Sequence, residues 1–214
     1  MINSQILDRI MQRLTRTAPT TRAIVLLELN EKIRELERGP VKPWFMEKSV
    51  SGVLTSLQNT LALPSDFLEE YEEGAFRIQD LQGAWSAPIK VPIERLEHET
   101  DALDPALPEG YSLFGEVFYL GPAPASAYPY KLKYYGRTAA IADDGATTTN
   151  QWALEFFNYL TLVVAHLVAN THLQSMEIVT KIEPELAIAH SHFWRAVESR
   201  KHANADYLVG DSEN

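Results

Sequence analysis

The sequence predicts an α+β fold: a helical bundle built from N- and C-terminal helices, with a β-rich insertion in the middle. Apolar residues recur at helical spacing near both ends, while prolines and short apolar runs crowd the middle. Residues 150–170 are apolar on nearly every side, so this helix needs cover on several sides and should be the centre of the bundle. The expected divisions are N-terminal helices in 1–40, the insertion in 41–148, C-terminal helices in 149–203 and a flexible tail in 204–214.

Two helices joined by a short turn are expected in the N-terminal part. Apolar residues at helical spacing give the first helix one face, and a similar stripe continues through the second. The expected capping residues are Asn3 or Ser4 for the first helix and Thr20 or Thr21 for the second, which Gly39 and Pro40 should end.

The middle of the chain has the frequent prolines and short apolar runs that are typical of short strands. Nine of the twelve prolines lie between residues 41 and 138, and the apolar runs there shorten to four to six residues. The expected strands are residues 50–54, 58–63, 75–78, 111–114, 116–120 and 130–135. Gly115 should form a tight reversal between two of them, and residues 93–103 match a short, acidic helix.

The C-terminal part should contain two further helices. Thr149 or Asn150 is the expected cap of the central helix, which should break near Asn170. Pro184 is best placed in the first turn of the last helix, where its missing N–H costs nothing.

Composition excludes several classes of protein. A formal net charge of −10 argues against a protein that holds nucleic acid by neutralising phosphates, although DNA could still pass near its surface. The chain has no cysteine, so it offers neither disulfides nor thiolate chemistry. Its beginning reads as an amphipathic helix rather than a signal peptide, and residues 150–170 are too interrupted for a membrane span. We therefore expect a protein made and used in a cytoplasm.

Histidines and clustered acidic residues are the candidates for site residues. His190 and His192 would point about 200° apart on a helix, so they cannot share a metal ion, and no metal or cofactor is expected. One acidic group, with no basic residue among its members, comprises Asp66, Glu69, Glu70, Glu72 and Glu73. Neither it nor the second group, in residues 94–104, has the spacing of a calcium loop. The simplest interpretation is a solvated acidic face, and the alternative is a surface selected for electrostatic repulsion.

Nucleotide-binding and hydrolase motifs are absent from the sequence. Lys131 and Lys133, interleaved with tyrosines, superficially match a strand that binds nucleic acid. Alternation favours a half-buried strand instead, with Tyr130, Leu132 and Tyr134 on its inner face. The residues therefore indicate no enzymatic activity.

Six short phrases occur in a characteristic order: Leu63-Pro64-Ser65-Asp66-Phe67, Tyr111-Ser112-Leu113-Phe114-Gly115, Tyr119-Leu120-Gly121-Pro122-Ala123-Pro124, Leu132-Lys133-Tyr134-Tyr135, Asp143-Asp144, and Thr149 to Leu160 with Trp152 and Tyr159. In this order they resemble the head-to-tail adaptor (connector or head-completion) proteins of tailed bacteriophages, over roughly residues 23–196. A departure is Val164-Ala165-His166, where the family often has a small residue, two others and alanine.

The resemblance implies a structural virion protein without catalysis, made in the host cytoplasm and located in the neck between head and tail. Such adaptors form a ring, commonly a dodecamer, that contacts the portal protein and a tail or nozzle protein while double-stranded DNA passes through. The acidic group Asp66–Glu73 would then be a channel surface that DNA does not adhere to. Tyr207, Leu208 and Val209, the apolar cluster of the tail, would order on the portal.

Two alternatives from other classes stay open. One is a different cytoplasmic oligomeric scaffold or binding module with the same α+β layout. The other is a cell-wall hydrolase that uses a carboxylate pair such as Glu72 and Glu97, since glycosidases need two carboxylates at a defined separation.

Overall fold

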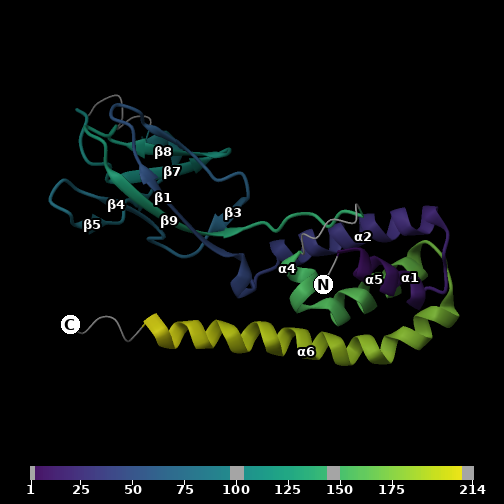
Figure 1. Cartoon of the computed structure of the whole chain (residues 1–214). Coiled ribbons are helices and arrows are strands. Elements are labelled where there is room, and N and C mark those ends of the chain that lie inside the picture. Colours follow the sequence, from purple (N-terminus) through teal and green to yellow (C-terminus); the bar gives the residue numbers. More distant parts are fainter. Residues whose placement is uncertain (1–2, 97–103, 144–149, 209–214) are drawn as a thin grey trace. The chain divides into compact units, whose positions relative to one another are not determined.

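The computed structural model describes residues 3–96, 104–143 and 150–208, with backbone alone for residues 200–208 (Figure 1). The chain forms two compact units. The helical unit comprises Met1–Phe45 and Thr138–Asn214, and the β unit comprises Met46–Arg137. Helices at both ends and strands between them confirm the α+β prediction, and the β unit begins and ends inside the expected limits of 41 and 148.

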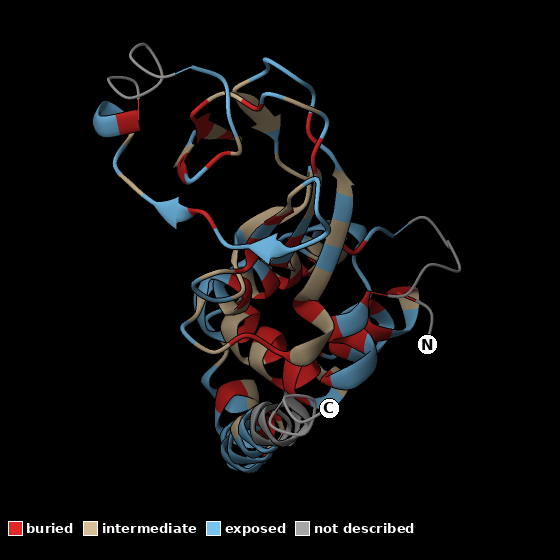
Figure 2. Ribbon diagram, turned by 90° about the vertical axis from the view of Figure 1, so that its left-hand side faces the viewer, coloured by how far each residue is buried: buried red, intermediate tan, exposed pale blue. Residues whose placement is uncertain are grey.

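The helical unit is organised around one helix. Its helices are α1 (Asn3–Arg13), α2 (Pro19–Arg38), α4 (Gln151–Glu155), α5 (Phe157–Thr171) and α6 (Met176–Leu208), and a short 3-10 helix, η1 (Trp44–Met46), follows α2. The other four α-helices all pack against α5. Eight residues of α5 are buried, and Figure 2 shows the buried residues of this unit gathered where its helices face one another. The prediction of a central helix is confirmed for α5.

The predicted single helix over residues 150–170 is wrong at one point, because the helix breaks at Phe156. Asn150 caps α4 as expected: its Oδ1 accepts from the N–H groups of Trp152 (2.8 Å) and Ala153 (3.3 Å). Phe156 then leaves helical geometry, at φ −123° and ψ 33°, before α5 begins. Its ring lies among the rings of Trp152 and Phe193, so tertiary packing fixes the break.

The predicted N-caps of the first two helices are also wrong. Asn3 lies within α1, and its Oδ1 accepts from the backbone N–H of Asn150 at 3.0 Å. The second helix begins at Pro19, with Ala18 before it and no side-chain cap. Proline is tolerated there because the first N–H groups of a helix have no partner inside it. Gly39 ends α2 as predicted.

Pro184 lies inside α6 rather than in its first turn, which corrects a further expectation. Because proline has no N–H, the carbonyl of Thr180 lacks its usual hydrogen bond from residue 184. Both Thr180 and Pro184 are exposed, so water can hydrogen-bond to that carbonyl instead. Val179 and Ile182 are buried just before the proline. Packing of this stretch therefore holds the helix continuous.

The β unit contains two sheets. In sheet A the order is β1 (Glu47–Val53), β9 (Pro129–Gly136), β4 (Phe76–Gln79) and β5 (Trp85–Ser86), with β3 (Phe67–Glu70) also paired to β9. In sheet B it is β2 (Thr60–Ala62), β8 (Val117–Gly121), β7 (Gly110–Phe114) and β6 (Ile89–Lys90). Neighbouring strands are antiparallel except β6 and β7.

All six predicted strands are present with shifted ends, whereas β3, β5 and β6 were not predicted. Gly115 makes the expected reversal between β7 and β8, with φ +64°. The inner faces of both sheets share one core, in which the rings of Phe76 and Phe118 stack with centroids 5.1 Å apart. Of the expected acidic helix, residues 93–96 are helical, and residues 97–103 lie outside the described residues.

Candidate functional site

The acidic group predicted from sequence lies on β3 and the turn that follows it. Asp66 directly precedes β3, and Glu69 and Glu70 belong to it. Glu69, Glu72 and Glu73 are exposed, whereas Asp66 and Glu70 are partly buried. The five carboxylates therefore divide into two environments.

Asp66 is held by two partners from sheet A. The ammonium of Lys48 on β1 forms an ion pair with Oδ2, and the hydroxyl of Tyr134 on β9 donates to Oδ1 at 3.0 Å. Burial opposes ionisation, but these two hydrogen bonds outweigh it and lower the pKa of Asp66 below its usual value. A Cβ on Gly136 would lie 2.6 Å from Cδ of Lys48 and 2.9 Å from Oδ2 of Asp66, so glycine leaves room for the pair.

Glu70 connects the two sheets. It extends from β3 in sheet A to Lys90 on β6 and to the hydroxyl of Tyr111 on β7, both in sheet B. The side chain of Glu70 is only 12% exposed, and the residue Tyr111 is 3% exposed. Glu70 is thus the acceptor for a hydroxyl that is buried with its ring.

Glu70→Ala is expected to lower the free energy of unfolding by about 1–3 kcal/mol, the cost of leaving a buried hydroxyl without a partner. The loss of the pair with Lys90 should add little, because that lysine is 54% exposed. Urea unfolding would measure the change as a shift in midpoint at constant slope. Glu73→Ala, in the exposed part of the same segment, should stay within about 0.5 kcal/mol. Equal effects of both variants would contradict the assigned role of Glu70.

Tyrosines around the acidic group have raised pKa values. Burial and the hydrogen bond to Asp66 raise the pKa of Tyr134 to about 12. Burial, with the nearby hydroxyl of Tyr71 and neighbouring carboxylates, raises the pKa of Tyr135 to about 12. Burial and the hydrogen bond to Glu70 also raise the pKa of Tyr111. All three phenols are therefore held in the protonated form.

These shifts predict a loss of stability at alkaline pH. An unfolded tyrosine has a pKa of about 10, so from there upward the unfolded state binds fewer protons than the folded state. The free energy of unfolding should fall as pH rises from about 10 to about 12. Urea midpoints across this range, with phenolate absorbance, would measure it, and Tyr134→Phe should reduce the slope. Titration of all nine tyrosines near pH 10 in the folded protein would contradict the prediction.

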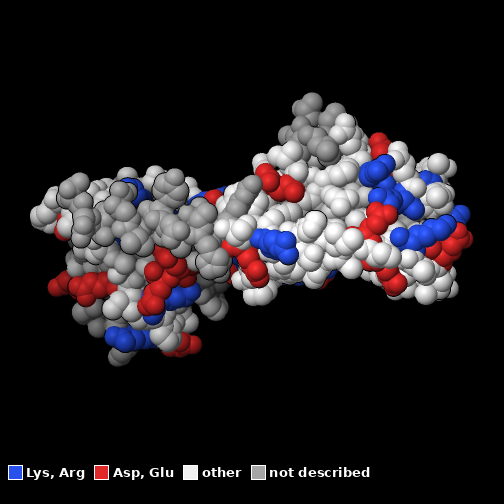
Figure 3. All heavy atoms as spheres, turned by 90° about the horizontal axis from the view of Figure 1, so that it is seen from below, with Lys and Arg blue, Asp and Glu red and all other residues white. Residues whose placement is uncertain are grey.

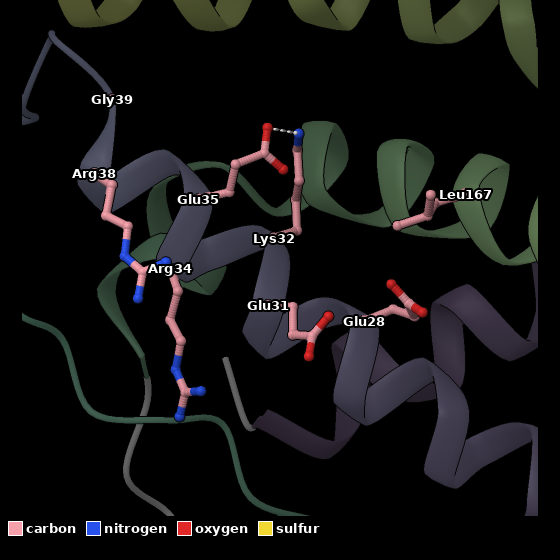
Figure 4. A pocket seen from close by; sticks show the side chains of 8 residues that line it. All are labelled: Glu28, Glu31, Lys32, Arg34, Glu35, Arg38, Gly39 and Leu167. Atoms are coloured by element: carbon pink, nitrogen blue, oxygen red, sulfur yellow. Dashed lines mark hydrogen bonds and ion pairs between the residues drawn. The ribbon is translucent and has the colours of Figure 1, made fainter.

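Sequence reasoning missed a groove beside α2. It has a volume of about 630 Å³ and is lined by Glu28, Glu31, Lys32, Arg34, Glu35, Arg38 and Gly39, with Leu167 from α5 (Figure 4). Lys32 pairs with Glu35 at 2.8 Å, and His172 contacts Glu28 at 2.7 Å beside it. The only available signal was the run of alternating charges along α2. Of the charged side chains, those of Lys32 and Glu28 are partly buried, whereas Glu31, Arg34, Glu35 and Arg38 are exposed.

Charges of both signs are also mixed elsewhere. On the face drawn in Figure 3, basic and acidic side chains form small neighbouring groups. In the helical unit, Arg22 pairs with Asp8 and Asp143, each at 2.5 Å. The hydrogen bonding between Arg22 and Asp143 lowers the pKa of Asp143.

Three of the described histidines contact neighbouring side chains: His166, His172 and His190. Trp194 Nε1 donates to Nε2 of His190 at 2.9 Å, and His166 lies 3.7 Å from Glu183. Among the residues that the structure describes, no three His, Asp or Glu side chains are grouped as a metal site requires. No helix in the described part of the chain combines the length and the apolar character needed to cross a membrane.

Lys131 and Lys133 lie on the outer face of β9, as the alternation predicted. Leu132 and Tyr134 are buried on the inner face. The Nζ of Lys131 lies 4.5 Å from the ring centroid of Trp85 on β5.

The structure describes only part of the segment predicted to bind portal, Tyr207, Leu208 and Val209. Tyr207 and Leu208 belong to the last turn of α6, so the helix continues into the expected tail. Val209 lies outside the described residues. The side chains of α6 are described up to residue 199, and the last buried one among them is Val197.

The chain matches a known protein family. The family described as SU10 adaptor protein matches residues 3–196, which include helices and strands of both units. No curated protein matches the sequence. The family match covers most of the chain and confirms the resemblance drawn from the ordered phrases. The chain therefore belongs to the SU10 adaptor protein family, a family of bacteriophage head-to-tail adaptors.

Proposed function

We propose that this chain forms a ring between the portal protein and the tail, through which the phage genome passes. The family match over residues 3–196 carries this proposal, because it includes nearly all of both units. The ring is dodecameric, lies in the neck of the virion and is completed by a tail or nozzle protein. Copies are made in the cytoplasm of the bacterial host.

The chemistry of the acidic group supports a structural role. Asp66 and Glu70 are engaged with Lys48 and Lys90, where they hold strands together. Glu72, one of the two carboxylates considered for a hydrolase, is exposed on the turn after β3, and Glu97 lies outside the described residues. The described carboxylates thus act in packing and at the surface, and the match to an adaptor family supports a structural rather than a catalytic role.

The exposed carboxylates of the same group suit a channel for DNA. Glu69, Glu72 and Glu73 add negative charge to a protein whose formal net charge is −10. Duplex DNA approaching such a surface is repelled, so it slides past without adhering. We assign these three residues to the channel and give Asp66 and Glu70 the structural role described above.

Mixing the purified protein with portal tests the proposal. Alone, the chain should be monomeric or weakly associated, because a net charge of −10 per copy opposes ring closure when screening extends over about 10 Å at 0.1 M salt. With portal it should form a ring that light scattering and electron microscopy detect. A protein that ignores portal and assembles some other closed particle would support the scaffold alternative instead.

A further inference from the structure

The outer face of sheet A has a cluster of cations that the adaptor function does not explain. Register places Arg77 of β4 directly opposite Lys131 of β9, and Lys133 lies two residues further along β9. All three side chains are exposed. Within the described residues none of them pairs with a carboxylate. We call Arg77, Lys131, Lys133 and the neighbouring Trp85 the basic end of this face.

This cluster works against the stability of the sheet. Like charges directly opposite one another on one face of an antiparallel pair are destabilising, and Arg77 and Lys131 stand in that relation. The ring of Trp85, 38% exposed, lies under Lys131 and offsets only part of this repulsion. An anionic partner that covered both cations would relieve the rest.

The other end of the same face is acidic, which limits the length of any partner. Tyr135 lies four residues from Lys131, so about 13 Å separates the two ends. Glu47 and Glu69 stand opposite Tyr135 in the register, and its ring contacts that of Tyr71 with centroids 5.2 Å apart. A long polyanion such as duplex DNA would cover both ends and meet these carboxylates. The partner that suits the face is therefore short.

We propose that the basic end binds a short, extended acidic segment of another protein, with carboxylates at alternate positions. Alternate residues of an extended chain are about 7 Å apart, which is also the spacing of Lys131 and Lys133 along β9. Two carboxylates at this spacing meet both lysines, and Arg77 lies one strand away, about 4.8 Å across the sheet. The proposed function assigns Glu69, at the acidic end of this face, to the channel, whereas this inference concerns the basic end and does not depend on ring formation.

The test uses the full chain and the blocked peptide Gly-Glu-Ser-Glu-Gly as a probe, followed through backbone amide signals in NMR. The peptide should shift signals of β4, β5 and β9, with an affinity that falls as salt is raised from about 0.05 M to about 0.5 M. The Gln-for-Glu peptide should not bind. R77S/K131S should weaken binding by about tenfold. K181S/R195S, which removes two exposed positive charges from α6, is the matched control and should retain binding.

The alternatives give distinct results. Equal weakening in R77S/K131S and K181S/R195S would reduce the effect to net charge and overturn the proposal. Tighter binding of a duplex of about 20 base pairs to the same strands would assign the face to nucleic acid. Self-association of the wild-type protein that R77S/K131S abolishes would assign it to a second copy. If R77S/K131S has a lowered melting temperature, the test is repeated with R77S alone, which leaves the contact between Lys131 and Trp85 intact. Assembly on portal by R77S/K131S would show that ring formation does not use this face.

Discussion

Phe193→Ala is expected to lower the free energy of unfolding by about 3–5 kcal/mol, the range for removing a large aromatic side chain from a core. Phe193 is 4% exposed and is the residue of α6 around which the aromatic core of the helical unit is built. Its ring stacks on Tyr159 of α5 at 4.4 Å and meets Phe156 edge-on at 4.8 Å. It also stacks on Trp152 of α4 at 6.3 Å. The truncation would leave a cavity that three neighbouring rings line.

Urea unfolding followed by circular dichroism would measure this effect. Phe156→Ala removes the neighbouring ring at the break between α4 and α5, and should fall in the same range of about 3–5 kcal/mol. Ile188→Ala is the control, because Ile188 lies on α6 but is 60% exposed, and it should change stability by less than about 0.5 kcal/mol. A loss below about 1 kcal/mol for Phe193→Ala would mean that α6 is not anchored through this side chain.

The sequence was sufficient to identify α5 as the central helix. A helix that is buried on all sides is apolar on all sides, and this pattern is visible without knowing which elements cover it. The break at Phe156 could not be predicted. It depends on aromatic residues that are distant in the sequence, Trp44 and Phe193 among them. Periodicity reports which sides of a helix are covered, not where tertiary contacts interrupt it.

Pro184 shows the same limit for a local rule. Proline in a helix interior removes one hydrogen bond, so the first turn was the reasonable position. In the structure, the buried side chains of Val179 and Ile182 keep the preceding turn helical. A rule based on the backbone alone omits that contribution from packing.

The acidic group was identified from sequence, but its division was not. The five carboxylates were grouped because they are close in the sequence. Their roles, however, depend on which strands lie beside β3. Lys48 is eighteen residues from Asp66, and Tyr111 is forty-one residues from Glu70. Since β3 itself was not predicted, neither pairing could be inferred.

Deleting residues 204–214 is expected to abolish portal binding while leaving the folded core intact. The deletion removes Tyr207, Leu208 and Val209, the apolar residues of a polar terminus. The helix α6 runs to Leu208, and Val197 is the last buried residue among those whose side chains the structure describes, so the deletion leaves the described core in place. The apolar side chains at the end of such a helix gain buried surface when the helix docks in a groove of a partner.

Two truncations separate this role from a general effect of shortening the chain. Removing residues 210–214 deletes only Gly-Asp-Ser-Glu-Asn and keeps the three apolar residues, so it should retain binding to portal. Removing residues 204–214 should leave the melting temperature unchanged but give no measurable complex by light scattering or calorimetry. Binding of this shorter protein at undiminished affinity would exclude the tail as the portal contact, although the chain would remain an adaptor by family. Loss of binding in both truncations would instead point to the acidic end, because residues 210–214 carry Asp211 and Glu213 but no large apolar side chain.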